Sequence, residues 1–406
     1  MRYEPFDPLS AQHQADPYRI YESLVSRGPV HRSRSGTWLV CGHALASQVL
    51  RDPIFSKDYA ATLTDNYGAA CATHFALRSL AQSFFVCANK AQGSIRKHFA
   101  KMLSPAQLHT HTASLRELAV SCLDRALQPA RASQPARAVR GDRADPLREF
   151  AVSYTLAALS TVFSIPGRLL EHIPALSHGI TAAIDCARLP TARLVELDRH
   201  AAAAAEHYCD YFQSAEAAES ECVAELLRLS QTYEISAESV FADLLFMLVA
   251  GFETTAGLIA QIAWYLAEHP ETTEALARNP ASIGIAVEEF ARLFPSIHLV
   301  TRRPSVDFDQ AGFRFLRGDR VLVLIAAANR DPEVFDNPGA FMLARPHSKR
   351  LLAFAPGPHH CIGAAFARYE VGLALETMIE RRAIVQARPP RWRKLGVFRI
   401  LSDVTA

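Results

Sequence analysis

The sequence lacks the long hydrophobic run that a membrane-spanning helix requires. Its longest uninterrupted apolar stretch, Leu244–Phe252, is far shorter than the roughly 20 residues that cross a bilayer. The N-terminal segment (MRYEPFDPLSAQHQADPY) contains acidic residues and prolines and no apolar core, so it does not have the pattern of a secretory signal. We therefore expect a cytoplasmic protein that binds no membrane.

The sequence also lacks an excess of charge of either sign. It has 43 Lys and Arg residues against 41 Asp and Glu residues, which gives a formal net charge of +2. This balance gives no support to nucleic-acid binding, which usually needs a strongly basic domain, and it excludes a highly charged disordered chain. The length of 406 residues suits one large domain or two to three small ones.

The eight cysteines form no CxxC pair and no dense framework. A large cytosolic chain keeps such thiols reduced, which excludes a disulfide scaffold. Most of these cysteines are expected to be small buried hydrophobic side chains. Cys361 is different because of the residues around it.

Helical patterns dominate residues 147–294, and short apolar runs around Ser35-Gly36 predict a β-hairpin over residues 30–41. The longest predicted helix begins after Ser236, a suitable N-cap, and extends to about His269. Its centre is apolar on every side, which predicts a buried helix. The polar run Glu253-Thr254-Thr255 inside it is costly unless it has a function or partners.

The pattern changes after residue 300. Residues 321–328 are apolar and resemble a strand in their first half, and residues 329–360 form a long irregular segment rich in Pro, Asn, Asp and Gly. Irregular connections of this length are usually functional. Residues 128–146, rich in Pro, Ala and Arg, are expected to form a surface loop.

Cys361 lies where the irregular segment enters a new helical pattern, within Phe354–Gly363 (FAPGPHHCIG). Free backbone N–H groups and the positive end of the helix dipole would favour a thiolate, the form that binds metal. Gly357 and Gly363 permit a close approach of the backbone to a flat ligand. The alternative is a buried cysteine beside a turn, but several independent residue choices agree on a ligand site.

This segment resembles the haem-binding loop of the cytochrome P450 family, whose pattern is F-G-x-G-x-R/H-x-C-x-G. The matching positions are Phe354, Gly357, His359, Cys361 and Gly363. Ala355 stands where the family usually has glycine. The resemblance implies that Cys361 is the axial ligand of a haem b iron and that His359 contacts a haem propionate. An axial thiolate pushes electron density onto the iron and favours cleavage of the O–O bond.

A second matching segment lies on the long predicted helix. Ala250 and Thr254 are four residues apart and share a face, and Gly251 permits a local opening against a planar cofactor. The resemblance implies that Glu253 and Thr254, an acid beside an alcohol, deliver protons to dioxygen. The alternative is a helix that merely tolerates these polar residues.

The third matching segment is Glu289-Phe290-Ala291-Arg292, whose acid and base are three residues apart on one helix face. Alone, such a pair is a common exposed feature worth little. In the family this pair is a buried structural lock joined by an arginine from a later loop, and Arg345 matches that arginine. We expect Glu289, Arg292 and Arg345 to be structural and not catalytic.

Two arginines match the family's propionate contacts. Arg96 stands at the arginine of an H-x-x-x-R pattern, but Gln92 replaces the histidine, which weakens or replaces one contact. Arg302 resembles a second propionate arginine, although its neighbour Arg303 is an alternative. Two buried haem carboxylates need about this much positive charge.

The resemblance spans nearly the whole chain, so we expect residues 1–406 to form a single cytochrome P450 domain. The implied fold class is mainly α with small β-sheets (α+β), with the haem between the long central helix and the Cys-loop helix. The residues expected to line an apolar substrate pocket are Phe84, Phe85, Phe246, Met247, His298, Leu299 and Val300.

The resemblance implies a monooxygenase that activates dioxygen and hydroxylates or epoxidises a small to medium, largely apolar substrate. The chain has no flavin or nicotinamide fingerprint and no four-cysteine iron–sulfur spacing. Electrons are therefore expected from a separate ferredoxin or flavodoxin. A peroxide-driven peroxygenase and a haem-binding protein without turnover are the alternatives.

Overall fold

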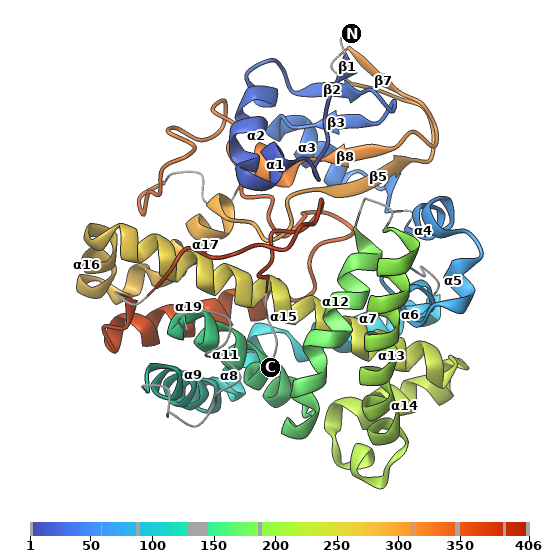
Figure 1. The fold of residues 1–406 in the computed structure, drawn as a ribbon, viewed down its shortest axis with the longest axis vertical. Helices are drawn as coiled ribbons and strands as arrows, with labels where there is room; N and C mark the ends of the chain where they lie inside the picture. Colours follow the sequence, from blue (N-terminus) through green and yellow to red (C-terminus); the bar gives the residue numbers. More distant parts are fainter. Residues whose placement is uncertain are drawn as a thin grey trace.

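The computed structural model describes residues 3–57, 59–86, 90–128, 145–185, 189–310, 312–345, 350–384 and 387–402. Helices form most of the described chain, and the strands gather at one end of the molecule (Figure 1). This mainly α arrangement with small sheets confirms the predicted fold class. The predicted surface loop at residues 128–146 falls almost entirely outside the described residues.

The α-helices of the described residues are α1 (Ala11–Ala15), α2 (Pro17–Val25), α3 (His43–Arg51), α4 (Tyr59–Tyr67), α5 (Ala70–Thr73), α6 (Phe75–Gln82), α7 (Lys90–Met102), α8 (Pro105–Thr110), α9 (Thr112–Leu127), α11 (Pro146–Phe163), α12 (Ile173–Ile184), α13 (Thr191–Gln213), α14 (Glu221–Tyr233), α15 (Ala237–Glu268), α16 (Pro270–Arg278), α17 (Ile283–Leu293), α18 (Ile325–Ala328) and α19 (Ala364–Glu380). The strands are β1 (Tyr3–Glu4), β2 (Val30–Ser33), β3 (Trp38–Val40), β4 (Phe55–Ser56), β5 (Val300–Pro304), β6 (Phe308–Gln310), β7 (Phe313–Phe315) and β8 (Val321–Val323).

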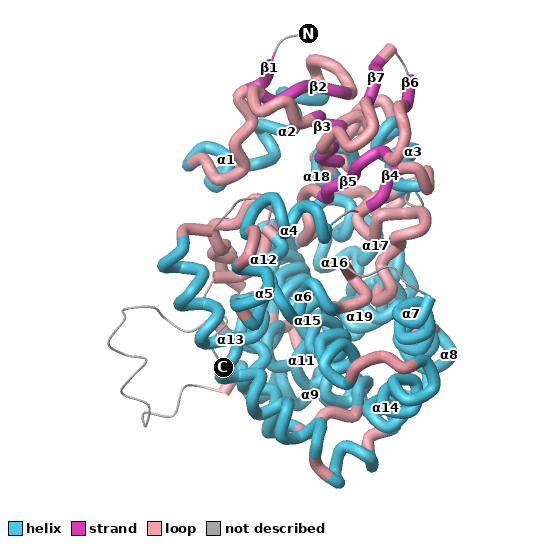
Figure 2. The backbone as a smooth tube through the Cα atoms, turned by 90° about the vertical axis from the view of Figure 1, so that its right-hand side faces the viewer, coloured by secondary structure: helices cyan, strands magenta, loops and turns pink. Residues whose placement is uncertain are grey.

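The larger sheet joins distant parts of the chain. Its strand order is β1-β2-β3-β8-β5-β4, and β6 and β7 form a separate pair. The predicted hairpin is β2–β3, and β8 pairs parallel with β3 and antiparallel with β5. The view in Figure 2 shows the strands together at one end of the tube, with the helices filling the rest. The sheet therefore ties the N-terminal region to the segment that leads to Cys361.

Helix α15 crosses the helical part of the molecule (Figure 1) and packs against α6, α11, α12 and α19. The Ser236 hydroxyl accepts a hydrogen bond from the backbone N–H of Ser239, and Pro270 follows the helix end, so the predicted helix is confirmed within one residue. Among the described residues, α15 alone is long and apolar enough to cross a membrane, but 83% of that stretch is buried in the protein. It is a core helix.

The aromatic-rich stretch after residue 58, for which the sequence shows no steady period, folds into three short helices, α4 to α6. Each helix is too short for the 3.6-residue spacing of its apolar residues to stand out in the sequence. Tertiary packing supplies most of the stability of such short helices. Tyr59, Leu77 and Leu80 contribute to the main hydrophobic core. This region forms one wall of the cavity described next.

Candidate functional site

A largely apolar cavity of about 310 Å³ lies between α15 and the loop that contains Cys361. Its size falls in the range of small-molecule sites. Residues from α7, α11, α12, α15, β5 and the C-terminal segment also line it. The sequence segments predicted to form a site, although far apart in the chain, therefore meet around one cavity.

Cys361 opens into this cavity from the end of the irregular segment, just before α19. The Cys361 backbone N–H donates to the Phe354 carbonyl oxygen at 2.9 Å, which closes the loop on itself. Burial raises the pKa of the Cys361 thiol, whereas the backbone N–H of Gly363 and the charges of Arg368 and Arg96 act in the opposite direction. The donors needed to stabilise a thiolate are thus in place.

Two residues of this loop adopt a left-handed backbone conformation. Gly357 has φ +111°, and a Cβ there would lie 2.3 Å from the Leu50 carbonyl oxygen, so only glycine fits. Ala355 has φ +48°, at the position where the family pattern usually has glycine. For an L-residue this conformation costs roughly 1–2 kcal/mol. Ala355 is therefore a strained position.

Replacing Ala355 by glycine is expected to stabilise the folded protein by about 0.5–1 kcal/mol, because relief of the strain exceeds the entropy that glycine adds to the unfolded chain. The measurement is the midpoint of denaturant unfolding. Ala353→Gly is the control, since Ala353 is not among the positive-φ residues, and it should destabilise. A lower midpoint for Ala355→Gly would contradict the interpretation.

One end of the cavity is lined by Lys57, Arg96, Arg302 and His359. The Arg96 Nη2 donates to the His360 carbonyl oxygen at 2.9 Å, and the buried Arg302 donates through Nη1 to the Thr301 carbonyl oxygen, while its Nε has no partner among the described residues. Burial and the charges of Lys57, Arg302 and Arg96 lower the pKa of His359 to about 4. This end is built to receive negative charge.

Successive side chains of β5 point to opposite faces of the strand, so only one of its two adjacent arginines can face the cavity. Arg302 is 2% exposed and lines the cavity, whereas Arg303 points outward and pairs with Asp65 at 2.8 Å. The side chain of Gln92 lies outside the described part of the structure, although its backbone belongs to α7. Lys57 is a site residue that sequence reasoning missed, because no motif marks a lysine at the end of a two-residue strand.

Helix α15 presents Ala250, Gly251, Glu253 and Thr254 to the cavity. The Thr254 hydroxyl donates to the Ala250 carbonyl oxygen at 2.8 Å, and α15 is continuous through this point. The expectation that Gly251 permits a local opening against a cofactor therefore stays a prediction. Its lack of a side chain matters for packing, because a Cβ there would lie 2.8 Å from Leu159 of α11.

The buried Glu253 carboxylate is held by partners from two other segments. Arg393 of the C-terminal segment donates from Nη1 to Glu253 Oε1 at 2.7 Å, and Thr181 of α12 donates to Oε2 at 3.0 Å. The His178 Nε2 lies 3.8 Å from Oε1. Burial raises the pKa of Glu253, and Arg393 and the hydroxyls of Ser177 and Thr181 lower it. Sequence reasoning missed Arg393.

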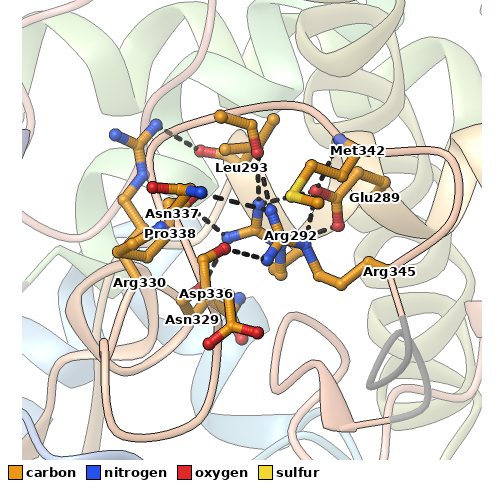
Figure 3. A network of polar contacts seen from close by, with 11 residues as sticks. Glu289, Arg292, Leu293, Asn329, Arg330, Asp336, Asn337, Pro338, Met342 and Arg345 are labelled. Atoms are coloured by element: carbon orange, nitrogen blue, oxygen red, sulfur yellow. Dashed lines mark hydrogen bonds and ion pairs between the residues drawn. The ribbon is translucent and has the colours of Figure 1, made fainter.

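Glu289, Arg292 and Arg345 form a buried polar network (Figure 3). None of these three residues lines the cavity. The Arg292 guanidinium binds both Glu289 oxygens, at 2.7 and 2.8 Å, and Arg345 Nε donates to Oε1 at 2.8 Å. Further guanidinium hydrogens bind the carbonyl oxygens of Asn329, Asp336, Asn337, Pro338 and Ala340. The three predicted residues therefore lock α17 to the irregular segment that precedes Cys361.

Five of the seven predicted pocket residues line the cavity: Phe84, Phe85, Phe246, Met247 and Val300. His298 and Leu299 do not. His298 is buried against α2, where its Nδ1 lies 3.1 Å from the Tyr21 hydroxyl, and burial lowers its pKa well below the usual value. Leu299 packs in the same N-terminal core. The cavity instead receives Pro295, Ser296 and Ile297, which directly precede His298 in the chain.

Known proteins share these features. The Cytochrome P450 family model matches residues 285–386, which include the Glu289 network and the Cys361 loop. The biotin biosynthesis cytochrome P450 of Bacillus subtilis is 28% identical over 256 residues, which cover 62% of this chain and 64% of that protein. The cytochrome P450 monooxygenase PikC of Streptomyces venezuelae is 28% identical over 380 residues, which cover 92% of this chain and 85% of PikC.

Solved structures agree on the fold. The complex of P450BioI with hexadec-9Z-enoic acid ligated acyl carrier protein has a TM-score of 0.82 at 23% identity, and covers 97% of this chain and 98% of that one. Epothilone D-bound cytochrome P450epoK has a TM-score of 0.81 at 21% identity, with 98% of both chains covered. The family match and the fold agree on the cytochrome P450 class of proteins. The chain belongs to the cytochrome P450 family, of the bacterial type.

The cofactor of this family is haem b, and the cavity fits it. The cavity lining offers a thiol at one wall and cations at one end. The buried Nε of Arg302, which has no partner in the described part of the chain, requires a hydrogen-bond acceptor. A flat, apolar macrocycle with two carboxylates matches this combination of an apolar cavity and a cationic end.

Proposed function

We propose that the protein is a haem-thiolate monooxygenase that uses dioxygen to hydroxylate or epoxidise a small to medium, largely apolar organic molecule. The observation that carries the proposal is the position of Cys361, which opens into an apolar cavity that the Glu253–Thr254 pair also lines. Haem b held by a thiolate supplies reductive activation of dioxygen. A cytoplasmic location belongs to the same proposal.

The proposed roles of the residues follow from their places around the cavity. Cys361 binds the iron, and Arg96, Arg302 and His359 hold the haem propionates. Phe354 covers the cysteine loop, where Arg368 stacks on its ring at 4.1 Å. Ala250 and Gly251 form the α15 surface against the macrocycle, and Gly357 and Gly363 shape the loop backbone.

Proton delivery is proposed for Glu253 and Thr254. The Glu253 carboxyl group takes up a proton and passes it through the Thr254 hydroxyl toward the cavity, after that hydroxyl leaves the Ala250 carbonyl oxygen. Arg393 sets the charge of Glu253 between transfers, since a nearby cation favours the ionised carboxylate. This acid–alcohol pair favours an oxygen-activating route over a peroxide-driven one.

The substrate is proposed to bind against an aromatic wall. Phe85 and Phe246 stack with ring centroids 4.6 Å apart, and Phe84 meets Phe246 edge to face at 5.8 Å. With Met247 and Val300, these side chains exclude water and offer apolar contact. The apolar wall suits ligands such as the acyl chain and the epothilone named in the two structures above.

The test is turnover with NADPH, a ferredoxin and its reductase under ¹⁸O₂, using ligands first selected by a shift of the Soret band. We expect a product that contains one labelled oxygen atom. Product formed with hydrogen peroxide but not with the ferredoxin system would support a peroxygenase instead. Absence of NADPH consumption with ferredoxin and flavodoxin donors would favour a haem-binding protein without turnover.

A further inference from the structure

Lys57 follows β4, a short strand whose antiparallel partner β5 carries Arg302. The paired residues are Phe55 with Pro304 and Ser56 with Arg303. One more step along this register brings Lys57 opposite Arg302. Like charges directly opposite each other on neighbouring strands are destabilising. This arrangement therefore calls for an anion close to both side chains.

Both cations line the cavity, at the end where Arg96 and His359 also lie. Within the described residues, no carboxylate pairs with Lys57, Arg96 or Arg302. Burial, together with the charges of Arg302 and Arg96, lowers the pKa of Lys57 to about 8. Arg302 is buried, and Lys57 and Arg96 are half-buried. Because buried cations are normally paired, we infer that an anion that enters the cavity supplies the partner of Arg302.

The Lys57 ammonium group is already oriented by the cavity wall. Its Nζ donates to the Phe85 carbonyl oxygen at 2.8 Å and lies 4.6 Å from the centre of the Phe85 ring. An ammonium group has three donors, so this hydrogen bond leaves donors for an acceptor in the cavity. Tyr59 and Phe246 contact the same ring, each with a centroid distance of 4.6 Å, and so fix its place.

We propose that Lys57 binds a haem propionate together with Arg302, and thereby supplies the cationic contact that Gln92 cannot provide. Through Phe85, the same lysine links the propionate to the aromatic wall of the substrate pocket. The proposal depends on the haem cofactor and not on the proposed reaction. A carboxylate on a substrate is the other possible source of the anion, and the experiment below separates the two.

The main test is transfer of haem from the purified ferric protein to excess apomyoglobin, without any organic ligand. We expect Lys57→Gln to release haem about tenfold faster than the natural protein, because a charge-assisted hydrogen bond is lost. Lys57→Arg should restore retention to within about twofold, since it keeps a charge that can bind a carboxylate. Lys101→Gln, which removes an exposed lysine of α7, is the control and should not change the rate.

Reconstitution with haem dimethyl ester provides a second readout. This haem has no ionised carboxylate, so Lys57→Gln and the natural protein should release it at equal rates. An equal rate with ordinary haem, or a tenfold difference that persists with the ester, would overturn the proposal. So would normal haem retention combined with weaker binding of dodecanoic acid but not of dodecanol, because the carboxylate would then be a substrate's. Far-UV circular dichroism of each variant checks that it is folded.

Discussion

Replacing Glu289 by alanine is expected to leave little folded, haem-containing protein. The substitution removes the only carboxylate that the described structure places against Arg292 and Arg345, whose side chains are 1% and 2% exposed. Breaking a buried ion pair in this way typically costs about 3–5 kcal/mol. Domains are stable by only about 5–15 kcal/mol in total. The measurement is the yield of soluble haem protein and its midpoint in urea.

A pair with the same spacing provides the control for this prediction. Arg193 and Glu196 are also three residues apart, with 2.8 Å between the charged groups, but their side chains are about half exposed. Glu196→Ala should leave both yield and midpoint nearly unchanged, because exposed ion pairs contribute little. Equal losses in the two variants would mean that the Glu289 network does not hold the fold together.

Replacing Glu253 by glutamine is expected to lower kcat about 100-fold, the scale typical of a lost acid–base group, with little change in KM. Glutamine keeps the shape and can still accept the Thr181 hydrogen bond, but it cannot carry a proton between water and Thr254. The haem spectrum should stay normal. The control is Glu238→Gln, an exposed residue in the first turn of the same helix, which should retain full turnover.

The role of Arg393 gives this prediction a pH-dependent form. Arg393 lowers the pKa of Glu253, while burial raises it. Arg393→Gln removes the lowering influence, so Glu253 keeps its proton to a higher pH. Because Glu253 donates a proton only in its protonated form, turnover should fall as pH rises through its pKa. We expect this alkaline limb of the kcat profile to move to higher pH in Arg393→Gln, while Lys394→Gln, which removes an exposed neighbouring charge, leaves it in place. An unmoved limb in Arg393→Gln would show that ionisation of Glu253 does not control turnover.

Local signals in the sequence were sufficient for the parts of the site that depend on neighbours in the chain. The N-cap at Ser236 and the stop at Pro270 define α15, because capping and helix breaking act within a few residues. The loop around Cys361 was identified from its glycines and its place before a helix. The Glu289–Arg292 spacing gave the first two members of the buried network.

Contacts between distant segments were not accessible in the same way. Arg393 lies 140 residues from Glu253 in the chain, and Lys57 meets Arg302 only because β4 pairs with β5. The position of His298 and Leu299 after α17 predicts that they line the pocket. In the structure, His298 instead packs against the aromatic rings of Tyr18 and Tyr21 on α2, away from the cavity. Such choices depend on tertiary packing, which periodicity along the chain does not report.

The central claim is that the Cys361 thiolate binds the haem iron. The most direct measurement is the absorption spectrum of the reduced, carbon monoxide-treated protein, compared between the natural sequence, Cys361→Ser and Cys209→Ser. We predict the Soret maximum diagnostic of thiolate ligation in the natural protein and in Cys209→Ser, whose half-buried cysteine lies on α13, and its loss in Cys361→Ser. The same maximum in Cys361→Ser, or its absence from the natural protein, would contradict the account.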